Sequence, residues 1–254
     1  LNNKQIFADQ YVRPGDMITW CRPPWEEPSI PASWEVIFDN GDLLVINKPS
    51  GLPVIPGGGY LKHTLIGLLN QKYGNQDSYL IPKPVHRLGR HTSGILICAR
   101  KKKSRSELSK IFRDGSQGKS SCKKIYRALS RSNKELPLGQ EFEVNVPIIQ
   151  RPHELIGMIW GGENTLSEDK SLALSARKKL DAHSIVKVLE RKDSSDLIEV
   201  RIVTGRPHQI RIHLSILGSP LIGDRLYGLQ GDICQSITPG DGGYSLHAHR
   251  FLNI

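Results

Sequence analysis

The sequence has few cysteines and no long hydrophobic segment, and each absence excludes a class of protein. Its four cysteines, Cys21, Cys98, Cys122 and Cys234, are too few and too widely spaced for a disulfide scaffold. None of them forms a Cys-x-x-Cys pair, so we expect no zinc site. No apolar run approaches the ~18 residues of a membrane helix. We therefore expect an intracellular protein without a membrane partner, in a compartment that the sequence leaves open: plastid, mitochondrion, nucleus or cytosol.

Acidic residues are outnumbered by basic ones. The chain carries 25 Asp plus Glu against 35 Lys plus Arg, a formal net charge of +10. Such an excess favours polyanionic partners, although basic surfaces also occur on proteins that bind no nucleic acid. With 38% hydrophobic residues, the 254 residues suffice for a core in one large domain or two small ones. The composition therefore indicates a folded globular protein.

Prolines divide the chain near its N-terminus. Four of them fall within residues 22–33, where they prevent a helix interior or a central strand, so this segment is interpreted as a linker. Residues 1–21, with a turn and a short strand expected over 11–19, are too few to fold alone and are interpreted as the remnant of an accessory domain. Residues 34–254 form the main domain. Because the sequence stops inside an apolar, strand-like stretch, we expect a C-terminal truncation. No long apolar stripe is evident, so we expect a monomer.

The main domain mixes strands and helices at irregular intervals. Thr64 predicts the cap of a helix that extends to residue 73, and further helices are expected over 104–114 and, from Pro207, over 207–217. Strands are expected at 42–48, 95–99, 125–129, 185–189 and 197–203. The last of these alternates apolar with polar residues and follows a hairpin turn at 194–196, as a half-buried antiparallel strand does. The pattern predicts an α+β fold with a mixed, mainly antiparallel sheet and flanking helices.

One glycine pattern and two histidine pairs do not make a binding site. The three glycines at 57–59 lack the Gly-Lys-Ser/Thr that follows in a phosphate-binding loop. On a helix, His208 and His213 point about 140° apart and cannot share a metal. His247 and His249 share a strand face but have no acidic or thiol ligand nearby. We interpret these histidines as structural or RNA-contacting and expect no metal.

Three segments concentrate basic residues beside expected strands or helices. Residues 86–94 (HRLGRHTSG) precede a buried strand, 123–128 (KKIYRA) interleave cations with one aromatic, and 205–213 (GRPHQIRIH) open a helix whose N-terminus favours anions. Taken alone, each is better explained as a polar loop or a solvated helix face. Their candidate RNA-binding side chains are Arg87, Arg90, Lys124, Arg127, Arg206 and His208.

In this order, the three segments and two further motifs resemble the RluA-type pseudouridine synthases. The further motifs are NKPSGLPV at 47–54 and GSPLIGDRLYG at 218–228, so the resemblance covers nearly the whole chain after the linker. It implies the catalytic fold of that family and an enzyme that isomerises uridine in RNA, such as rRNA or tRNA, without a cofactor. The target base must leave the stack, which favours loops and bulges. The N-terminal tail is similar to the end of the accessory RNA-binding domain of many members.

The resemblance also implies roles for individual residues. Tyr126 would pack against the flipped base, and Arg87 would fill the gap that the base leaves or hold its phosphate. Arg211 would sit at the active centre, paired with the catalytic carboxylate. Ile212 and Leu214 would support the pocket wall.

The sequence departs from the family at the active centre, because the essential aspartate belongs where this chain has Gly89. Losing a nucleophile or general base costs on the order of 10³ to 10⁶ in rate. It would also leave Arg211 without its buried counter-ion unless another acid, water or phosphate compensates. One reading is a synthase whose carboxylate comes from elsewhere, with Asp224 and Asp241 as candidates, although Asp224 also suits a plain turn role.

Other readings of the glycine remain open. The protein is then a catalytically inactive RNA-binding pseudoenzyme, acting as an RNA chaperone or assembly factor, or the aspartate is missing through error or engineering. A different class is a metabolic enzyme that binds a small phosphate through Arg87, Arg206 and Arg211. Such an enzyme predicts little effect of long RNA on substrate binding.

Overall fold

The computed structural model describes residues 2, 4–7, 9–19, 24–74, 80–117, 119, 121–163 and 178–254. Its helices are α1 (Leu65–Tyr73), α2 (Lys102–Ser116), α3 (Gln209–Ile216) and the 3-10 turn η4 (Leu229–Gly231). Its strands are β1 (Glu35–Asp39), β2 (Leu43–Lys48), β3 (Lys83–Pro84), β4 (Thr92–Ala99), β5 (Lys123–Arg131), β6 (Glu141–Val144), β7 (Ile148–His153), β8 (Gly157–Gly162), β9 (Lys179–Leu180), β10 (Ser184–Arg191), β11 (Ser195–Ile202) and β12 (Leu246–Leu252). Within these ranges no helix is long and apolar enough to cross a membrane.

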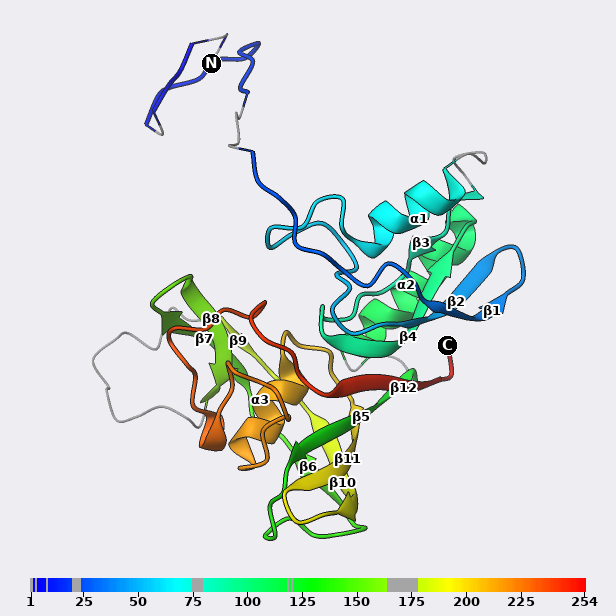
Figure 1. Cartoon of the computed structure of the whole chain (residues 1–254), viewed down its shortest axis with the longest axis vertical. Helices are drawn as coiled ribbons and strands as arrows, with labels where there is room; N and C mark the ends of the chain where they lie inside the picture. Colours follow the sequence, from blue (N-terminus) through cyan, green and yellow to red (C-terminus); the bar gives the residue numbers. More distant parts are fainter. Residues whose placement is uncertain are drawn as a thin grey trace.

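One large sheet organises the domain. Its strands follow the order β1-β2-β4-β12-β5-β11-β10-β6, with β3 also paired to β4. Only the contact of β12 with β4 is parallel, and the other pairs in this sheet are antiparallel. A second sheet, β8-β7-β9, lies beside α3 and away from α1 and α2 (Figure 1). The expected mixed, mainly antiparallel α+β architecture is confirmed.

The helices cover both faces of the large sheet. Leu44 of β2 belongs to the same core cluster as Leu65 of α1 and Leu214 of α3, and all three are fully buried. The neighbouring Leu43 packs instead with the cluster of Phe112 on α2. Because successive strand residues point to opposite faces, α1 and α3 share one face and α2 covers the other. Each fully buried leucine contributes about 1.5–3 kcal/mol of transfer free energy.

Several local predictions are confirmed. Thr64 caps α1, and its hydroxyl accepts a hydrogen bond from the amide of Gly67 at 3.1 Å. The expected antiparallel strand is β11, which pairs with β10 through a hairpin. Helix α2 begins two residues earlier than expected and continues through Gly115 to Ser116. Gly115, predicted to end the helix, keeps helical backbone geometry and lies inside it.

The third helix begins later than the sequence predicts. His208 has a left-handed backbone with φ of 55°, which no residue inside a right-handed helix adopts, so Pro207 lies outside α3. Tertiary contacts of Gln209 explain the later start. Its side-chain amide donates to the carbonyl of His183 and its oxygen accepts from Thr204 Oγ1, both at 2.9 Å. These contacts fix the loop against β10 before the helix starts.

The N-terminal predictions have mixed outcomes. The expected turn forms, with the amide of Asp16 donating to the carbonyl of Arg13 at 3.0 Å, but residues 11–19 contain no strand. The described part of the proline-rich segment has neither helix nor strand, and it is fastened to the loop before α1. The Glu27 carboxylate accepts from the amides of Leu61 and His63 at 2.9 and 2.7 Å. The division into accessory domain, linker and catalytic domain stays a prediction.

Candidate active site

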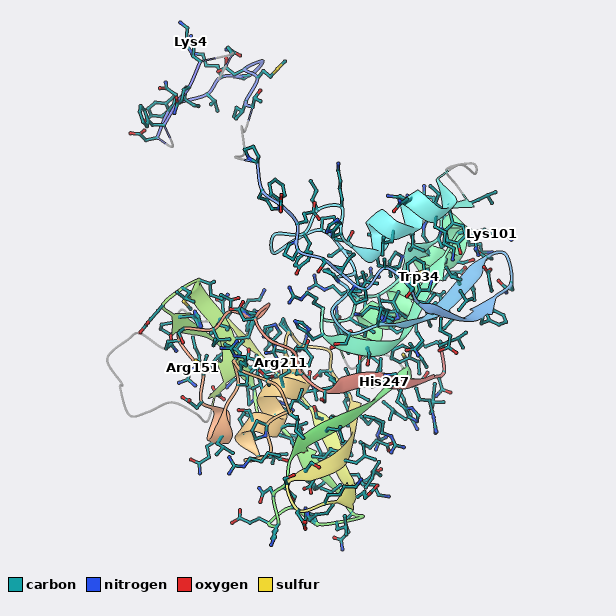
Figure 2. The ribbon with its side chains drawn as sticks, viewed as in Figure 1. Lys4, Trp34, Lys101, Arg151, Arg211 and His247 are labelled. Atoms are coloured by element: carbon teal, nitrogen blue, oxygen red, sulfur yellow. The ribbon has the colours of Figure 1, made fainter. Side chains whose placement is uncertain are left out.

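Arg211 of α3, labelled in Figure 2, forms a buried two-point ion pair with Asp224. Arg211 Nε lies 2.6 Å from Asp224 Oδ2, and Nη2 lies 2.8 Å from Oδ1. The side chains are only 4% and 1% exposed. Burial opposes the charge of the guanidinium, yet the hydrogen bonds and charge of Asp224 raise the pKa of Arg211 above its ordinary value.

Asp224 is fully engaged as this counter-ion. Its Oδ1 also accepts hydrogen bonds from the amides of Leu226 and Tyr227 at 3.0 and 3.1 Å. Both carboxylate oxygens therefore serve the ion pair and the turn after it. Arg211 is therefore paired with the carboxylate of Asp224, which is 1% exposed, and not with an acid at residue 89. The predicted place of Arg211 beside a catalytic carboxylate stays a prediction.

Two aromatic rings enclose the guanidinium. Arg211 Cζ lies 4.4 Å from the ring centroid of Tyr244 and 4.9 Å from that of Tyr227. Cation–π contacts of this kind contribute about 0.5–2 kcal/mol each, more when water is excluded. The rings and Asp224 together hold Arg211 in one position.

Gly89 borders this group from the loop before β4. Its backbone is exposed, and its carbonyl accepts from the amide of Thr92 at 3.1 Å. A Cβ atom at this position would lie 2.5 Å from the hydroxyl oxygen of Tyr244. That hydroxyl is 3.3 Å from Thr92 Oγ1. The space next to Gly89 is therefore taken by a phenol from the far end of the chain.

Tyr244 had no role in the sequence interpretation, although the segment PGDGGYSLHAH at 239–249 contains it. Its position two residues before β12 is visible in the sequence. Its contact with Gly89 depends on the parallel pairing of β12 with β4, which brings Leu246 opposite Thr92. That pairing is a tertiary contact between distant segments, and no local pattern announces it.

A buried lysine anchors the loop that carries Gly89. Lys48 is 0% exposed, and its ammonium donates to the carbonyls of Pro49, Leu52 and Arg90 at 2.9, 2.8 and 3.0 Å. The hydroxyl of Ser50 donates to the next carbonyl, that of His91, at 2.8 Å. Three acceptors require three N–H donors, which only the protonated amine supplies. Burial lowers the pKa of Lys48 to about 7.

The two arginines around Gly89 have different surroundings. Arg90 donates to the hydroxyl of Tyr60 and lies 5.1 Å from its ring centroid, and its Nε donates to His91 Nε2 at 3.0 Å. Arg87 is exposed. Of the pair, Arg87 is open to solvent, and Arg90 is held against the loop of Tyr60.

The second basic segment does not form the open surface that was predicted. Lys124 is 5% exposed, and its ammonium donates to the carbonyl of Phe112 and to Ser116 Oγ at 3.1 and 2.7 Å. It joins β5 to α2 and presents no open surface to RNA, so its predicted RNA contact stays a prediction. Tyr126 is 9% exposed within the main core, edge-on to Phe251, and burial raises its pKa. It offers little free surface for stacking on a base.

The remaining predicted RNA contacts are dispersed. Arg127 pairs with Glu199 at 2.9 Å and points to the sheet face opposite Tyr126, away from Arg211. It does line a cavity of about 370 Å³ that Tyr244 also borders. Arg206 is half-buried, and its Nε donates to the carbonyl of Asp181 at 2.7 Å.

His208, a predicted RNA contact, differs from the predicted arginines in its charge. Its Nδ1 lies 2.7 Å from the hydroxyl of Tyr227, which in turn donates to the carbonyl of Trp160. Burial, aided by the charge of Arg211, lowers the pKa of His208 to about 3. The side chain is therefore neutral near pH 7 and supplies no positive charge to a phosphate.

The predicted pocket wall is core. Leu214 is 0% exposed in the main cluster, and Ile212 is 1% exposed in a second cluster with Tyr227. Neither lines either of the two cavities found. Both residues are buried on α3, the helix that carries Arg211, and their predicted role in supporting a pocket wall stays a prediction.

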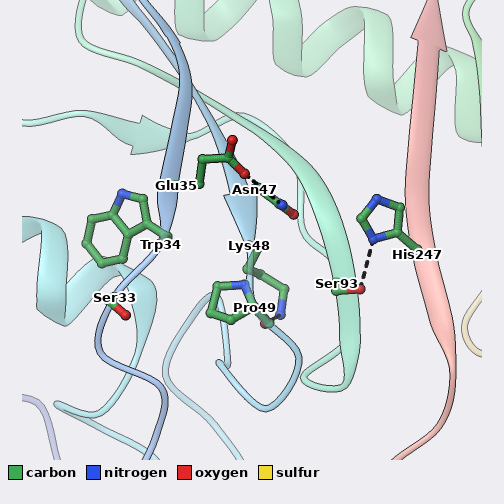
Figure 3. A pocket seen from close by; sticks show the side chains of 8 residues that line it. All are labelled: Ser33, Trp34, Glu35, Asn47, Lys48, Pro49, Ser93 and His247. Atoms are coloured by element: carbon green, nitrogen blue, oxygen red, sulfur yellow. Dashed lines mark hydrogen bonds between the residues drawn. The ribbon is translucent and has the colours of Figure 1, made fainter.

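Two cavities adjoin each other beside β4 and β12. The first, of about 420 Å³, lies among the side chains shown in Figure 3, which include Trp34, Asn47 and Pro49. The second, of about 370 Å³, extends to Tyr244. Ser93 and His247 line both, with Ser93 Oγ 3.0 Å from His247 Nδ1. In the described part of the chain, no cluster of three or more His, Cys, Asp or Glu is placed to bind a metal.

Structural comparison identifies the class of fold. The domain superimposes on human RNA pseudouridylate synthase domain containing 1 with a TM-score of 0.61, covering 89% of this chain and 80% of that one at 22% identity. The fold is therefore that of the pseudouridylate synthases.

Sequence comparison gives the family. The family model described as RNA pseudouridylate synthase matches residues 42–216. The chain is 39% identical over 258 residues to an uncharacterised RNA pseudouridine synthase of Synechocystis, covering 100% of this chain and 80% of the relative. It is 36% identical over 300 residues to RNA pseudouridine synthase 5 of Arabidopsis thaliana, covering 98% and 77%. The chain belongs to the RNA pseudouridylate synthase family, and the resemblance drawn from its motifs is confirmed.

Proposed function

We propose that this protein binds RNA and isomerises uridine to pseudouridine without a cofactor. The N1–C1′ bond breaks, the uracil turns, and a C5–C1′ bond forms. C5 loses one proton and N1 gains one, so no oxidant, reductant or co-reactant is needed. One observation carries the proposal: the guanidinium of the buried Arg211–Asp224 pair lies over the ring of Tyr244, whose hydroxyl borders the exposed Gly89.

The arrangement is suited to holding a flipped nucleotide. Arg211 is fixed before any substrate arrives, and such preorganised charge stabilises developing charge at little reorganisation cost. The exposed Arg87, two residues from Gly89, is placed to contact a phosphate of the same nucleotide. The net charge of +10 adds a general attraction to RNA.

A second candidate function is RNA binding without catalysis. It is favoured by the hydrogen bonds of Asp224 and Asp241, the two candidates for replacing the missing aspartate at residue 89. Asp224 is committed to Arg211, and the carboxylate of Asp241 accepts from the amide and hydroxyl of Thr238 at 2.7 and 2.9 Å. These bonds from Thr238 lower the pKa of Asp241 and hold it in an exposed turn. Neither is free to replace a carboxylate at residue 89.

Nucleoside analysis separates the two functions. RNA transcripts rich in loops are incubated with the protein, digested to nucleosides, and assayed for pseudouridine by mass spectrometry, while binding is measured across a salt series. We expect pseudouridine to accumulate. Saturable, salt-dependent binding with no pseudouridine in any transcript overturns the synthase function in favour of the second candidate.

The RNA surface is tested with two exposed arginines. Arg87→Gln is expected to weaken binding and to lower the salt slope by about 1, as the loss of one phosphate contact does. Arg113→Gln, at a side chain 62% exposed on α2, is the matched control and should leave both quantities unchanged. Equal effects of the two substitutions would contradict a phosphate contact at Arg87.

A further inference from the structure

We propose that the phenol of Tyr244 is the acid–base group of this centre, standing in the space that a side chain at residue 89 would otherwise occupy. The inference rests on the proposed uridine isomerisation and deepens it, because it names the group that handles the substrate's protons. Three observations support it: the fit between Tyr244 and Gly89, the surroundings of the hydroxyl, and the proton balance of the reaction.

A side chain at residue 89 and the hydroxyl of Tyr244 compete for the same space. A Cβ on residue 89 would lie 2.5 Å from Tyr244 Oη and 3.2 Å from Thr92 Oγ1. A Cβ atom essentially never lies within 3.0 Å of such an atom, so any larger residue at 89 must displace the hydroxyl. Gly89 has no positive φ, so its backbone does not itself require glycine. The absence of a side chain at this position is therefore matched to the presence of the phenol.

The surroundings suit a group that gains and loses a proton. The guanidinium of Arg211 lies 4.4 Å from the ring centroid, where it attracts negative charge developing on the oxygen. Thr92 Oγ1, 3.3 Å from Tyr244 Oη, can act as either donor or acceptor. The ring of His91 is edge-on at 5.7 Å. The residue is half-buried and borders the 370 Å³ cavity.

The reaction leaves one proton transfer for such a group. Once the C5–C1′ bond has formed, C5 still carries its hydrogen, and N1 lacks one. The oxygen of Tyr244 takes the C5 proton, and its hydroxyl proton passes to N1. The C5–H electron pair restores the C5=C6 double bond, and the phenol ends as it began.

Release of tritium from carbon 5 of uridine reads this step directly. RNA labelled with [5-³H]uridine is mixed with excess protein, and release is timed for the native chain, Tyr244→Phe and Tyr73→Phe. Tyr73 of α1 loses the same hydroxyl away from the centre and is the matched control. RNA affinity and thermal unfolding are measured for all three.

We expect Tyr244→Phe to release tritium 10² to 10⁴ times more slowly, the usual contribution of a general acid–base group. Its RNA affinity and unfolding temperature should match those of the native chain, and Tyr73→Phe should keep the native rate. A slowing of less than tenfold, with an active native chain, overturns the assignment of Tyr244 alone. A native chain that binds RNA and releases no tritium overturns the proposed function and this inference together.

A double variant tests whether a side chain at residue 89 and the hydroxyl of Tyr244 compete for the same space. Without the hydroxyl, the nearest ring atom to a Cβ at residue 89 is Cζ of residue 244, at 3.8 Å, an ordinary contact. Gly89→Asp combined with Tyr244→Phe is therefore expected to exceed Tyr244→Phe at least tenfold in tritium release. Gly89→Asp alone should fall below the native rate, because it displaces the phenol. If the double variant releases tritium no faster than Tyr244→Phe, the two groups do not compete for one space, and this part of the inference is overturned.

Discussion

Replacing Asp224 with asparagine removes the counter-ion of Arg211 and nearly preserves the side-chain volume. The guanidinium is 4% exposed and keeps its charge, so the variant buries a cation whose partner is neutral. The asparagine oxygen can replace one of the two bonds at 2.6 and 2.8 Å, but its NH₂ group then faces another donor. Breaking one side of a buried pair costs about 3–5 kcal/mol.

The expected loss is large enough to measure by two methods. For a domain of 150–250 residues, about 2–4 °C of Tm is lost per kcal/mol, so Tm should fall by roughly 6–20 °C. Urea unfolding followed by circular dichroism should show a lower midpoint with an unchanged m-value. Glu163→Gln is the control, because it breaks an ion pair of similar length, 2.8 Å to Lys179, whose side chains are 31% and 51% exposed. That pair should contribute only about 0–1 kcal/mol.

A loss within 1 kcal/mol of the control would refute the reasoning. Arg211 would then be accommodated without Asp224, and Asp224 would be available for another role at the centre. A fall in m-value would instead indicate that the variant has changed the compactness of one state, and the comparison of midpoints would not measure the ion pair.

Further predictions concern the core and the loop. Burial lowers the pKa of His213 to about 4 against about 6.5 unfolded, so its full contribution to stability is present above pH 6.5 and falls by about 1.4 kcal/mol per pH unit toward pH 4. His208, whose pKa is lowered to about 3, adds a loss of the same sign, and an equal urea midpoint at pH 6.5 and 4.5 would contradict both. Lys48→Met should speed amide hydrogen exchange at residues 89–92 but not in α2, because the Arg90 carbonyl loses the hydrogen bond from the Lys48 ammonium. Unchanged exchange at residues 89–92 would contradict the role of Lys48 in holding this loop. Gly94→Ala should destabilise strongly in urea unfolding, because its Cβ would lie 2.3 Å from a carbonyl of β12 and its φ is 104°; a native midpoint would exclude this packing.

Local signals in the sequence predicted the elements well. The hydroxyl of Thr64 and the alternation along β11 each act within a few residues, and both features are present in the structure. The start of α3 was missed because Gln209 bonds to β10, a contact outside its own segment. Family motifs gave the fold and located Arg211, since motif order reflects the whole chain.

The candidate site was harder to predict than the fold. The alternation of β5 places Lys124 and Tyr126 on one face, but only tertiary contacts show that both are buried: Lys124 bonds to Phe112 and Ser116 of α2, and Tyr126 packs in the main core cluster. The ammonium of Lys48 is bound by three backbone carbonyls, and not by a carboxylate. Because every residue has a backbone carbonyl, the sequence gives no sign that this lysine is buried. Tyr244 reaches Gly89 through a parallel strand pair, which joins segments that the sequence keeps far apart.

The central claim is that this chain isomerises uridine although residue 89 carries no acid. The most direct measurement is the release of tritium by the unaltered protein, in excess over RNA labelled with [5-³H]uridine, with bound RNA quantified in the same samples. We predict that release follows binding and approaches one tritium per target uridine. Fully bound RNA that retains its tritium would contradict the claim.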